Sequence, residues 1–340
     1  MRKQALGSCE VSVIGMGTAE FGGRHPEGLA RDLLDAYVSI GGNLVDTARV
    51  YGDFATPRNG ESEKIVGRWM EARGNRREIF LSTKGGHPPL DDMRRSRLSP
   101  EEIRGDMAAS LEDLRTDYVD IYWLHRDDPS RPVGQIMETL HSLVENGSAR
   151  MVGVSNWAPA RIREANAWAD AHGLTRLSAN QPQFSLAEQR FFLDPTTRGM
   201  DTETWRMHRE TGMPCFCFSS QAHGYFTRLD TRGEDALTES LRREFDCPEN
   251  RAILDRIRAV REETGLSAGS IALAWLISQP FPAFPLVGAS KVEHVLALRE
   301  AGDAMLTEAQ RDMLRTVVCP RIGFPYGYGN GLPGSGRPLV

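Results

Sequence analysis

Apolar and polar residues along this chain follow two alternating patterns. Short apolar runs bounded by turn residues, such as residues 44–48 after Gly41 and Gly42, predict buried strands. Longer segments carry apolar residues every three or four positions and predict amphipathic helices, as in residues 100–114, which follow a capping sequence at Ser99. Because the two patterns follow one another, the sequence predicts a succession of strand–helix units.

The predicted elements are numerous enough to indicate a fold. Strands are predicted at residues 11–16, 44–48, 79–83, 118–124, 151–154, 177–180, 214–218 and 283–287. Helices are predicted at residues 27–40, 61–73, 100–114, 133–146, 158–172, 201–211, 249–263, 268–278 and 291–300, and again from Thr307. Repeated strand–helix units imply a parallel sheet, and eight of them predict an α/β fold of the (β/α)8 TIM-barrel type. An open, doubly wound sheet is the alternative.

The same patterns predict a single domain followed by a tail. We expect residues 1–318 to form the barrel, with residues 1–10 as an N-terminal hairpin cap, a long polar insertion after residue 218 and extra C-terminal helices. From Cys319 the chain becomes rich in Gly, Pro and Tyr without a period, which predicts a flexible tail at residues 319–340. The alternative is that the aromatic residues of this tail fold over the barrel mouth and contact the substrate.

Composition narrows the possible partners. A net charge of −5 over 340 residues gives no indication of the basic surface that binds nucleic acid, so we expect no nucleic-acid partner. The five cysteines are odd in number and form no CxxC pair, which favours reduced thiols and a cytoplasmic location. We find no apolar run near the ~20 residues of a membrane span, and no HExxH or paired-His spacing, so we expect neither a membrane partner nor a metal site. The oligomeric state is left open.

Four residues whose side chains could take part in catalysis lie at or just beyond the ends of early predicted strands. Asp46, Lys84 and His125 close the second, third and fourth predicted strands, and Tyr51 follows shortly after Asp46. An ammonium beside a tyrosine lowers the pKa of the phenol, and a carboxylate can balance the ammonium. A histidine can orient a substrate oxygen. The set could therefore protonate a carbonyl oxygen while a hydride, supplied by a cofactor, reaches the carbon. Each residue alone has a structural explanation, so the prediction depends on their conjunction.

A series of motifs in a fixed order extends this picture. It comprises Gly15-Met16-Gly17-Thr18, Asp46-Thr47-Ala48 with Tyr51-Gly52, Gly60-Glu61-Ser62-Glu63, Ser82-Thr83-Lys84, residues 117–125, residues 152–156, Asn180-Gln181, Phe218-Ser219-Ser220 and residues 287–291. Through these motifs the chain resembles the aldo-keto reductase superfamily. The resemblance implies a (β/α)8 barrel, NADPH as hydride donor and reduction of a carbonyl to an alcohol. It makes Tyr51 the general acid, Asp46 and Lys84 the pair that tunes it, and His125 the substrate-orienting residue.

The resemblance also implies a cofactor site. Ser155, Asn156 and Gln181 would hold the nicotinamide amide, Phe218 would stack on its ring, and Ser219, Ser220 and Gln221 would line the pyrophosphate. Gly288, Ser290, Lys291 and His294 would bind the adenosine end, and Gly17, Thr18 and Asp46 complete the expected set. Ser290 and Lys291 suit a 2′-phosphate, which favours NADPH or NADP+, with NADH as the alternative. His294 and Ala297-Leu298 stand where many members have Gln and Glu-Asn.

The resemblance implies that the substrate is a small-molecule carbonyl compound. The expected pocket wall is Phe21, Ala48, Phe54, Trp123, Arg126 and the insertion, although Trp123 suits the barrel core equally well. Arg49 and Arg126-Asp127-Asp128 suggest a polar or sugar-like aldehyde or ketone, and His87 and His223 lie within reach without an assigned role. The alternatives are a cofactor-sensing binding subunit like a channel β-subunit, an epimerase or lyase that uses bound nicotinamide transiently, and a cofactor-free phosphate-binding barrel.

Overall fold

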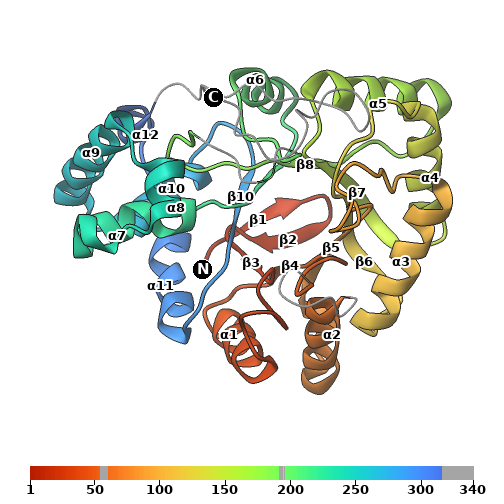
Figure 1. Ribbon diagram of the computed structural model, residues 1–340, viewed down its shortest axis with the longest axis horizontal. Coiled ribbons are helices and arrows are strands. Elements are labelled where there is room, and N and C mark those ends of the chain that lie inside the picture. The colour runs from red at the N-terminus through yellow and green to blue at the C-terminus, as the bar shows by residue number, and fades with distance from the viewer. Residues whose placement is uncertain (54–59, 191–193, 195, 316–340) are drawn as a thin grey trace.

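A closed parallel barrel forms the body of the protein in a computed structural model that describes residues 1–53, 60–190, 194 and 196–315. The eight barrel strands are hydrogen-bonded in the order β10-β3-β4-β5-β6-β7-β8-β9, and helices surround them (Figure 1). This confirms the predicted (β/α)8 fold. Phe54 and the predicted tail lie outside the described residues.

The described elements are bounded as follows. The strands are β1 Lys3–Leu6, β2 Cys9–Ser12, β3 Gly15–Gly17, β4 Leu44–Asp46, β5 Phe80–Gly85, β6 Val119–Leu124, β7 Ala149–Ser155, β8 Ala179–Gln181, β9 Cys215–Cys217 and β10 Ala283–Val287. The helices are α1 Glu27–Ser39, α2 Glu61–Arg73, α3 Pro100–Leu114, α4 Val133–Glu145, α5 Pro159–His172, α6 Thr202–Thr211, α7 Tyr225–Arg232, α8 Glu239–Phe245, α9 Pro248–Thr264, α10 Ala268–Ile277, α11 Val292–Asp303 and α12 Glu308–Leu314. None of these helices is both long and apolar enough to span a bilayer.

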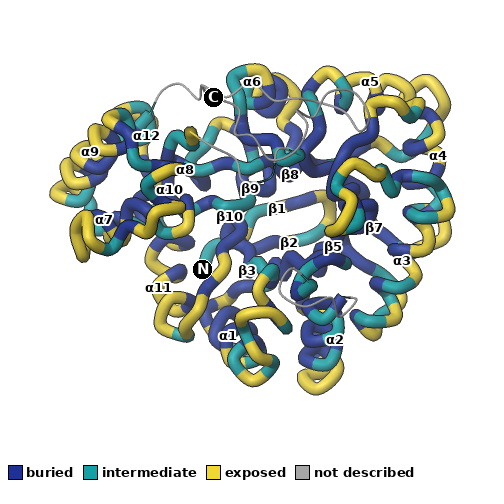
Figure 2. The backbone as a smooth tube through the Cα atoms, in the orientation of Figure 1, coloured by how far each residue is buried: buried dark blue, intermediate teal, exposed yellow. Residues whose placement is uncertain are grey.

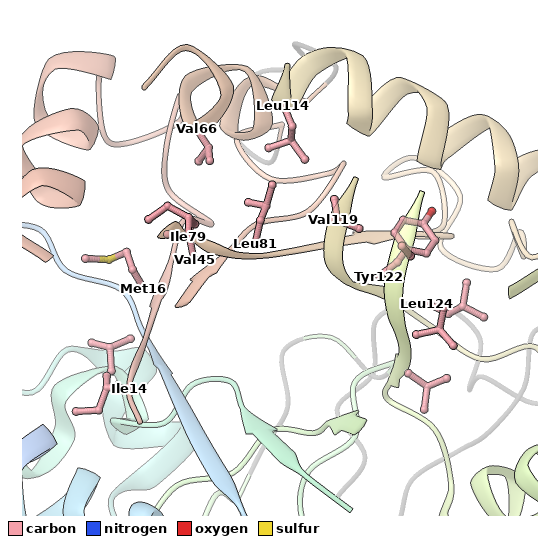
Figure 3. Close-up of a cluster of buried hydrophobic side chains, with 14 of the residues drawn as sticks. Ile14, Met16, Val45, Val66, Ile79, Leu81, Leu114, Val119, Tyr122 and Leu124 are labelled. Carbon is pink, nitrogen blue, oxygen red and sulfur yellow. The ribbon is translucent and has the colours of Figure 1, made fainter. Parts of the chain in front are cut away.

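Two apolar layers hold the barrel together. Inside it, residues such as Phe80, Phe216 and Phe284 pack with Leu6 and Val11 of the antiparallel β1–β2 hairpin. Outside it, strand and helix side chains interlock; Figure 3 shows part of this layer, including Val45, Leu81, Val66 and Leu114. Figure 2 shows that the barrel strands are largely buried and that exposed residues gather on the outer faces of the helices. The rigid strands therefore fix the positions of whatever follows their carboxyl ends.

Two parts of the predicted fold need correction. The strand expected at residues 11–16 is divided, because β2 ends at Ser12 and the barrel strand β3 begins at Gly15. Ser12 Oγ is 3.1 Å from Ile14 O and 2.7 Å from the Tyr37 hydroxyl, which hold the chain in a bend between the two strands. The polar insertion contains α7 and α8, two helices of eight and seven residues. They are too short to produce a clear helical period in the sequence.

Candidate active site

The carboxyl ends of neighbouring barrel strands bring the four predicted catalytic residues together. Asp46 ends β4, Lys84 lies near the end of β5, His125 follows β6 directly, and Tyr51 lies in the loop after β4. Because β4, β5 and β6 are adjacent and parallel, these residues meet at one end of the barrel. The β1–β2 hairpin packs on inner-barrel residues through Leu6 and Val11.

Lys84 and Asp46 form a buried ion pair. Lys84 Nζ lies 2.5 Å from Asp46 Oδ2 and donates a second hydrogen bond to Thr47 O at 2.8 Å. Asp46 Oδ1 accepts from Ser82 Oγ at 2.6 Å and from Gln181 Nε2 at 3.1 Å. A buried ion pair is stable only when its remaining polar atoms are satisfied, and here both carboxylate oxygens have donors.

Tyr51 lies against this pair. Lys84 Nζ is 4.6 Å from the centroid of the Tyr51 ring, and the two side chains also share a hydrogen bond. Burial raises the pKa of Tyr51, and the opposing effect of the Lys84 ammonium is smaller. The expectation of an unusually acidic phenol therefore does not describe this structure. The phenol keeps its proton at neutral pH, which is the state that a proton donor needs.

Lys84 itself stays charged. Burial lowers the pKa of its ammonium, but Asp46 and Tyr51 outweigh this effect and raise the pKa above its ordinary value. A cation is therefore held beside the phenol oxygen at every pH at which the protein would work. A charge in this position can stabilise a phenolate.

His125 faces Tyr51 across the site. The two rings are 5.9 Å apart between centroids and nearly perpendicular. Burial lowers the pKa of His125 well below 6.5, and His87, Arg126 and Lys84 add to the shift. His125 is therefore a neutral imidazole, able to donate one hydrogen bond to a substrate oxygen.

The residues expected to hold the nicotinamide amide adjoin this centre. Asn156 Nδ2 donates to Ser155 Oγ and to His125 O, both at 3.0 Å, and Ser155 Oγ donates to Gln181 O at 2.7 Å. Asn156 has φ 64°, a left-handed conformation that its surroundings must stabilise, and its Oδ1 accepts from Arg198 N at 2.8 Å. Gln181 links the group to Asp46. The three residues expected to bind the nicotinamide amide thus form one hydrogen-bonded cluster that is joined to Asp46.

The residues expected at the adenosine end also lie together. Helix α11 begins after Lys291 with no side-chain cap among the described residues, and the His294 N–H donates to Lys291 O at 3.2 Å, which leaves the N–H groups of Val292 and Glu293 for an anion. Ser290, Lys291 and His294 are exposed at this helix start, and Gly288 follows β10 with no atom within 4 Å of a Cβ placed there. These residues fit a phosphate-bearing ligand.

The remaining predicted cofactor residues differ in exposure. Phe218, Ser219 and Gln221 are partly exposed, whereas Ser220 is buried and donates to Leu286 O at 2.7 Å. Thr18 is buried and bonds to Asp46 O and Ser62 Oγ, so its side chain supports β4. Gly17, at the end of β3, is partly exposed. Thr18 therefore has a visible structural role, while the other residues remain a prediction.

The expected pocket-wall residues lie deeper than anticipated. Phe21 and Trp123 are fully buried. Trp123 packs edge-to-face on Phe216 inside the barrel and donates from Nε1 to Ser82 Oγ at 2.6 Å. Trp123 therefore occupies the barrel-core position that the sequence left open as an alternative, and it supports Asp46 through Ser82.

The arginines expected near the mouth are engaged internally. Arg126 donates to Asp194 Oδ2 at 2.6 Å and to His125 O at 2.8 Å, which ties the loop after β8 to the end of β6. Arg49 pairs with Glu63 at 3.0 Å and with Asp113. Both charges are therefore balanced within the protein.

Three contributors to the site were missed or unassigned from the sequence. Ser82 bonds Asp46, Asp194 pairs with Arg126, and His87 packs its ring 4.7 Å from that of His125. The position of His87, three residues beyond Lys84 at the end of a strand, was the available signal. His223 is exposed, and its ring lies 6.1 Å from that of Phe245.

Metal and disulfide chemistry can be examined in the described residues. They contain no group of three or more His, Cys, Asp or Glu side chains placed to hold a metal ion. Cys9, Cys215, Cys217 and Cys247 are free thiols there, and Cys319 lies outside the described part of the chain.

Comparison with known proteins places this geometry in context. The model of the aldo/keto reductase family matches residues 13–318. Similar curated proteins include an aryl-alcohol dehydrogenase [NADP(+)] of Phanerodontia chrysosporium, 30% identical over 93% of this chain and 85% of its own length. They also include the aldo-keto reductase ausK of Emericella nidulans, 29% identical over 87% and 74%, and a norsolorinic acid reductase of Aspergillus flavus, 28% identical over 94% and 80%.

Proposed function

The chain belongs to the aldo-keto reductase family and is an NAD(P)H-dependent oxidoreductase, and on this premise we propose that it reduces an aldehyde or ketone with NADPH, using Tyr51 as proton donor. The observation that carries the proposal is the buried Lys84–Asp46 pair beside Tyr51. An ammonium 2.5 Å from its counter-ion and 4.6 Å from the phenol ring is placed to stabilise a phenolate, and has no evident role in a purely structural site.

The residues of this chain supply the proton chemistry. A bound nicotinamide cofactor would supply the hydride for the carbonyl carbon. His125 donates a hydrogen bond to the carbonyl oxygen and fixes its position, and Tyr51 transfers its phenolic proton to that oxygen as negative charge develops there. Lys84 stabilises the resulting phenolate, and Asp46 keeps Lys84 charged and in place.

The residues predicted to bind the cofactor can be assigned to its separate parts. Ser155, Asn156 and Gln181 would hold the nicotinamide amide beside Asp46, with Phe218 against the ring. The uncapped start of α11, with Ser290 and Lys291, would hold a 2′-phosphate, which supports NADPH over NADH. His294 would lie near the adenosine end, and Ser219, Ser220 and Gln221 near the pyrophosphate.

For the substrate we favour an aromatic carbonyl compound. The polar or sugar-like class was inferred from Arg49 and Arg126, and both are paired with carboxylates inside the protein. The site instead presents a run of rings, because His125 contacts both Tyr51 and His87. The names of two similar proteins, an aryl-alcohol dehydrogenase and a norsolorinic acid reductase, support the same class of substrate.

A panel of aromatic, aliphatic and sugar aldehydes with the matching ketones tests this proposal. NADPH oxidation should be fastest, as kcat/KM, with the aromatic members. Quenching of tryptophan fluorescence by NADPH without reduction of any carbonyl compound would favour a cofactor-sensing subunit. Substrate turnover without net NADPH consumption would favour an epimerase or lyase, and the absence of any quenching would favour the cofactor-free barrel.

A further inference from the structure

His87 lies beside the predicted substrate-orienting histidine. It follows the end of β5 and is only 6% exposed. Its ring centroid is 4.7 Å from that of His125, with 67° between the ring planes. His125 in turn meets the Tyr51 ring at 5.9 Å. Each of two imidazoles in contact disfavours a positive charge on the other, so the pair favours two neutral rings.

The hydrogen-bond network assigns the tautomer of His87. Its Nδ1 lies 2.7 Å from Pro88 O, and a carbonyl oxygen can only accept, so Nδ1 carries the hydrogen. Burial, with a further contribution from Arg126, lowers the pKa of His87 to about 4. The ring is therefore neutral at the pH of catalysis.

The same reasoning assigns the opposite tautomer to His125. Its Nδ1 is buried and has no hydrogen-bond partner among the described residues. A buried N–H without an acceptor is rarer and less favourable than a buried lone pair without a donor. The hydrogen of the neutral ring is therefore on Nε2, and Nε2–H is the group that can donate to a carbonyl oxygen.

We propose that His87 is a positioning residue for His125. Contact between the rings prevents rotation of the His125 imidazole and keeps water away from its Nδ1, so that Nε2–H stays directed at the substrate. The cations Lys84 and Arg126 disfavour an imidazolium at His125, and Arg126 and Arg97 do so at His87. Asp194 and the Pro88 carbonyl favour a charge on His87 but do not outweigh burial, and Tyr51 is neutral. The proposal rests on the role given to His125 in the proposed function.

Two substitutions at His87 separate positioning from simple packing. His87→Ala removes the ring, admits water beside His125 Nδ1 and frees the imidazole to rotate, so we expect kcat/KM to fall about 100-fold. His87→Phe keeps a ring of similar shape without a titrating nitrogen, and it should restore most of the activity. His172→Ala is the matched control, because it removes an exposed histidine of α5 that stacks on Trp168 far from the site, and it should change nothing.

Histidine NMR gives a readout independent of turnover. In the wild-type protein, 15N-labelled His125 should show the Nε2–H tautomer and His87 the Nδ1–H tautomer, with assignments from His125→Asn and His87→Phe. His125 should not titrate between roughly pH 5.5 and 7.5 in the wild type or in His87→Phe, whereas in His87→Ala its pKa should rise toward its ordinary value of about 6.5.

The outcomes distinguish this inference from the proposed function. An Nδ1–H tautomer at His125, or unchanged kcat/KM and titration in His87→Ala, would overturn the role of His87 even if Tyr51→Phe is inactive. Full activity of Tyr51→Phe and His125→Asn would instead overturn the proposed function. If His87→Ala does not fold, the wild-type tautomer and His87→Phe still decide the question.

Discussion

At the scale of single residues, the Asp46–Lys84 pair governs the behaviour of Tyr51. The sequence suggested that Lys84 would make the phenol acidic, and Lys84 does act in that direction. Burial acts more strongly and raises the pKa, a contribution that no sequence pattern reveals, because it depends on how tightly the loop after β4 is enclosed. The role that we propose for the ammonium is therefore to stabilise the phenolate after the proton has left.

Removing the Asp46 carboxylate should show how much the buried ion pair with Lys84 contributes to the stability of the protein. Asp46→Asn leaves the Lys84 ammonium buried with neutral partners, Thr47 O and the Tyr51 hydroxyl, in place of its counter-ion, so we expect the free energy of unfolding to fall by about 3–5 kcal/mol. Urea unfolding measures the change. The control is Asp170→Asn, which breaks an exposed pair with Arg176 and should cost about 1 kcal/mol or less. Equal effects of the two substitutions would contradict our view of the pair.

Lys291 tests the preference for NADPH. It is exposed at the start of α11, where its ammonium can meet a 2′-phosphate. Lys291→Ala should weaken NADPH binding by roughly tenfold, the loss of one charge-assisted hydrogen bond of about 1.5 kcal/mol, and leave NADH binding unchanged. Fluorescence titration of both cofactors measures this. Equal dissociation constants for NADPH and NADH in the wild type would reject the assignment.

At the scale of elements, long helices with clear caps were predictable and short segments were not. The bounds of α2 and α3 match the sequence prediction, because Gly74 stops α2 and a capping box at Ser99 starts α3. Helices α7 and α8 were missed for lack of length. Contacts between elements, such as Ser82 of β5 with Asp46 of β4 or Arg126 with Asp194, could not be predicted, since they join segments far apart in the sequence.

The close approach of α2 and α3 provides a test at this scale. A Cβ on Gly67 of α2 would lie under 3.0 Å from the backbone of Asp113 and Leu114, so Gly67→Ala should destabilise the protein by about 1–3 kcal/mol. Gly105 of α3 has no atom within 4 Å of such a Cβ, and Gly105→Ala should stabilise the helix by about 0.5–1 kcal/mol. Thermal or urea unfolding compares the two, and effects of the same sign would show that the contact is not rigid.

At the scale of the whole molecule, the closed barrel brings residues that follow successive strands in the sequence together at one face. Asp46, Lys84 and His125 could be predicted to converge because adjacent parallel strands end at the same face. The orientation of each side chain could not be predicted from the sequence. For this reason the sequence left Trp123 open between the pocket wall and the barrel core, and it assigned no role to His87.

Buried histidines should make the stability of the molecule sensitive to acid. Burial lowers the pKa values of His87 and His208 to about 4, and that of His125 falls as well. Between pH 6.5 and 4 the unfolded chain binds protons that the folded chain excludes, so stability is full above pH 6.5 and falls on acidification, by on the order of 2 kcal/mol per histidine at pH 5. Asp127, whose pKa burial raises to about 6, and Glu63, whose pKa burial also raises, act in the opposite direction and offset part of this loss.

Urea unfolding at pH 7 and pH 5 measures this effect. His208→Asn removes one of the titrating rings without touching the site, so its loss of stability between the two pH values should be smaller than that of the wild type. Identical stability at the two pH values, or an unchanged pH dependence in the variant, would contradict the prediction.

The most direct test of the account is the turnover of Tyr51→Phe. This change removes the phenolic proton and keeps the ring beside Lys84, so kcat for NADPH-dependent carbonyl reduction should fall by about 100- to 10,000-fold, while the dissociation constant of NADPH is unchanged. Tyr225→Phe, which removes a phenol bonded to Asp246, is the matched control and should retain activity. If Tyr51→Phe reduces carbonyl substrates at the wild-type rate, Tyr51 is not the proton donor.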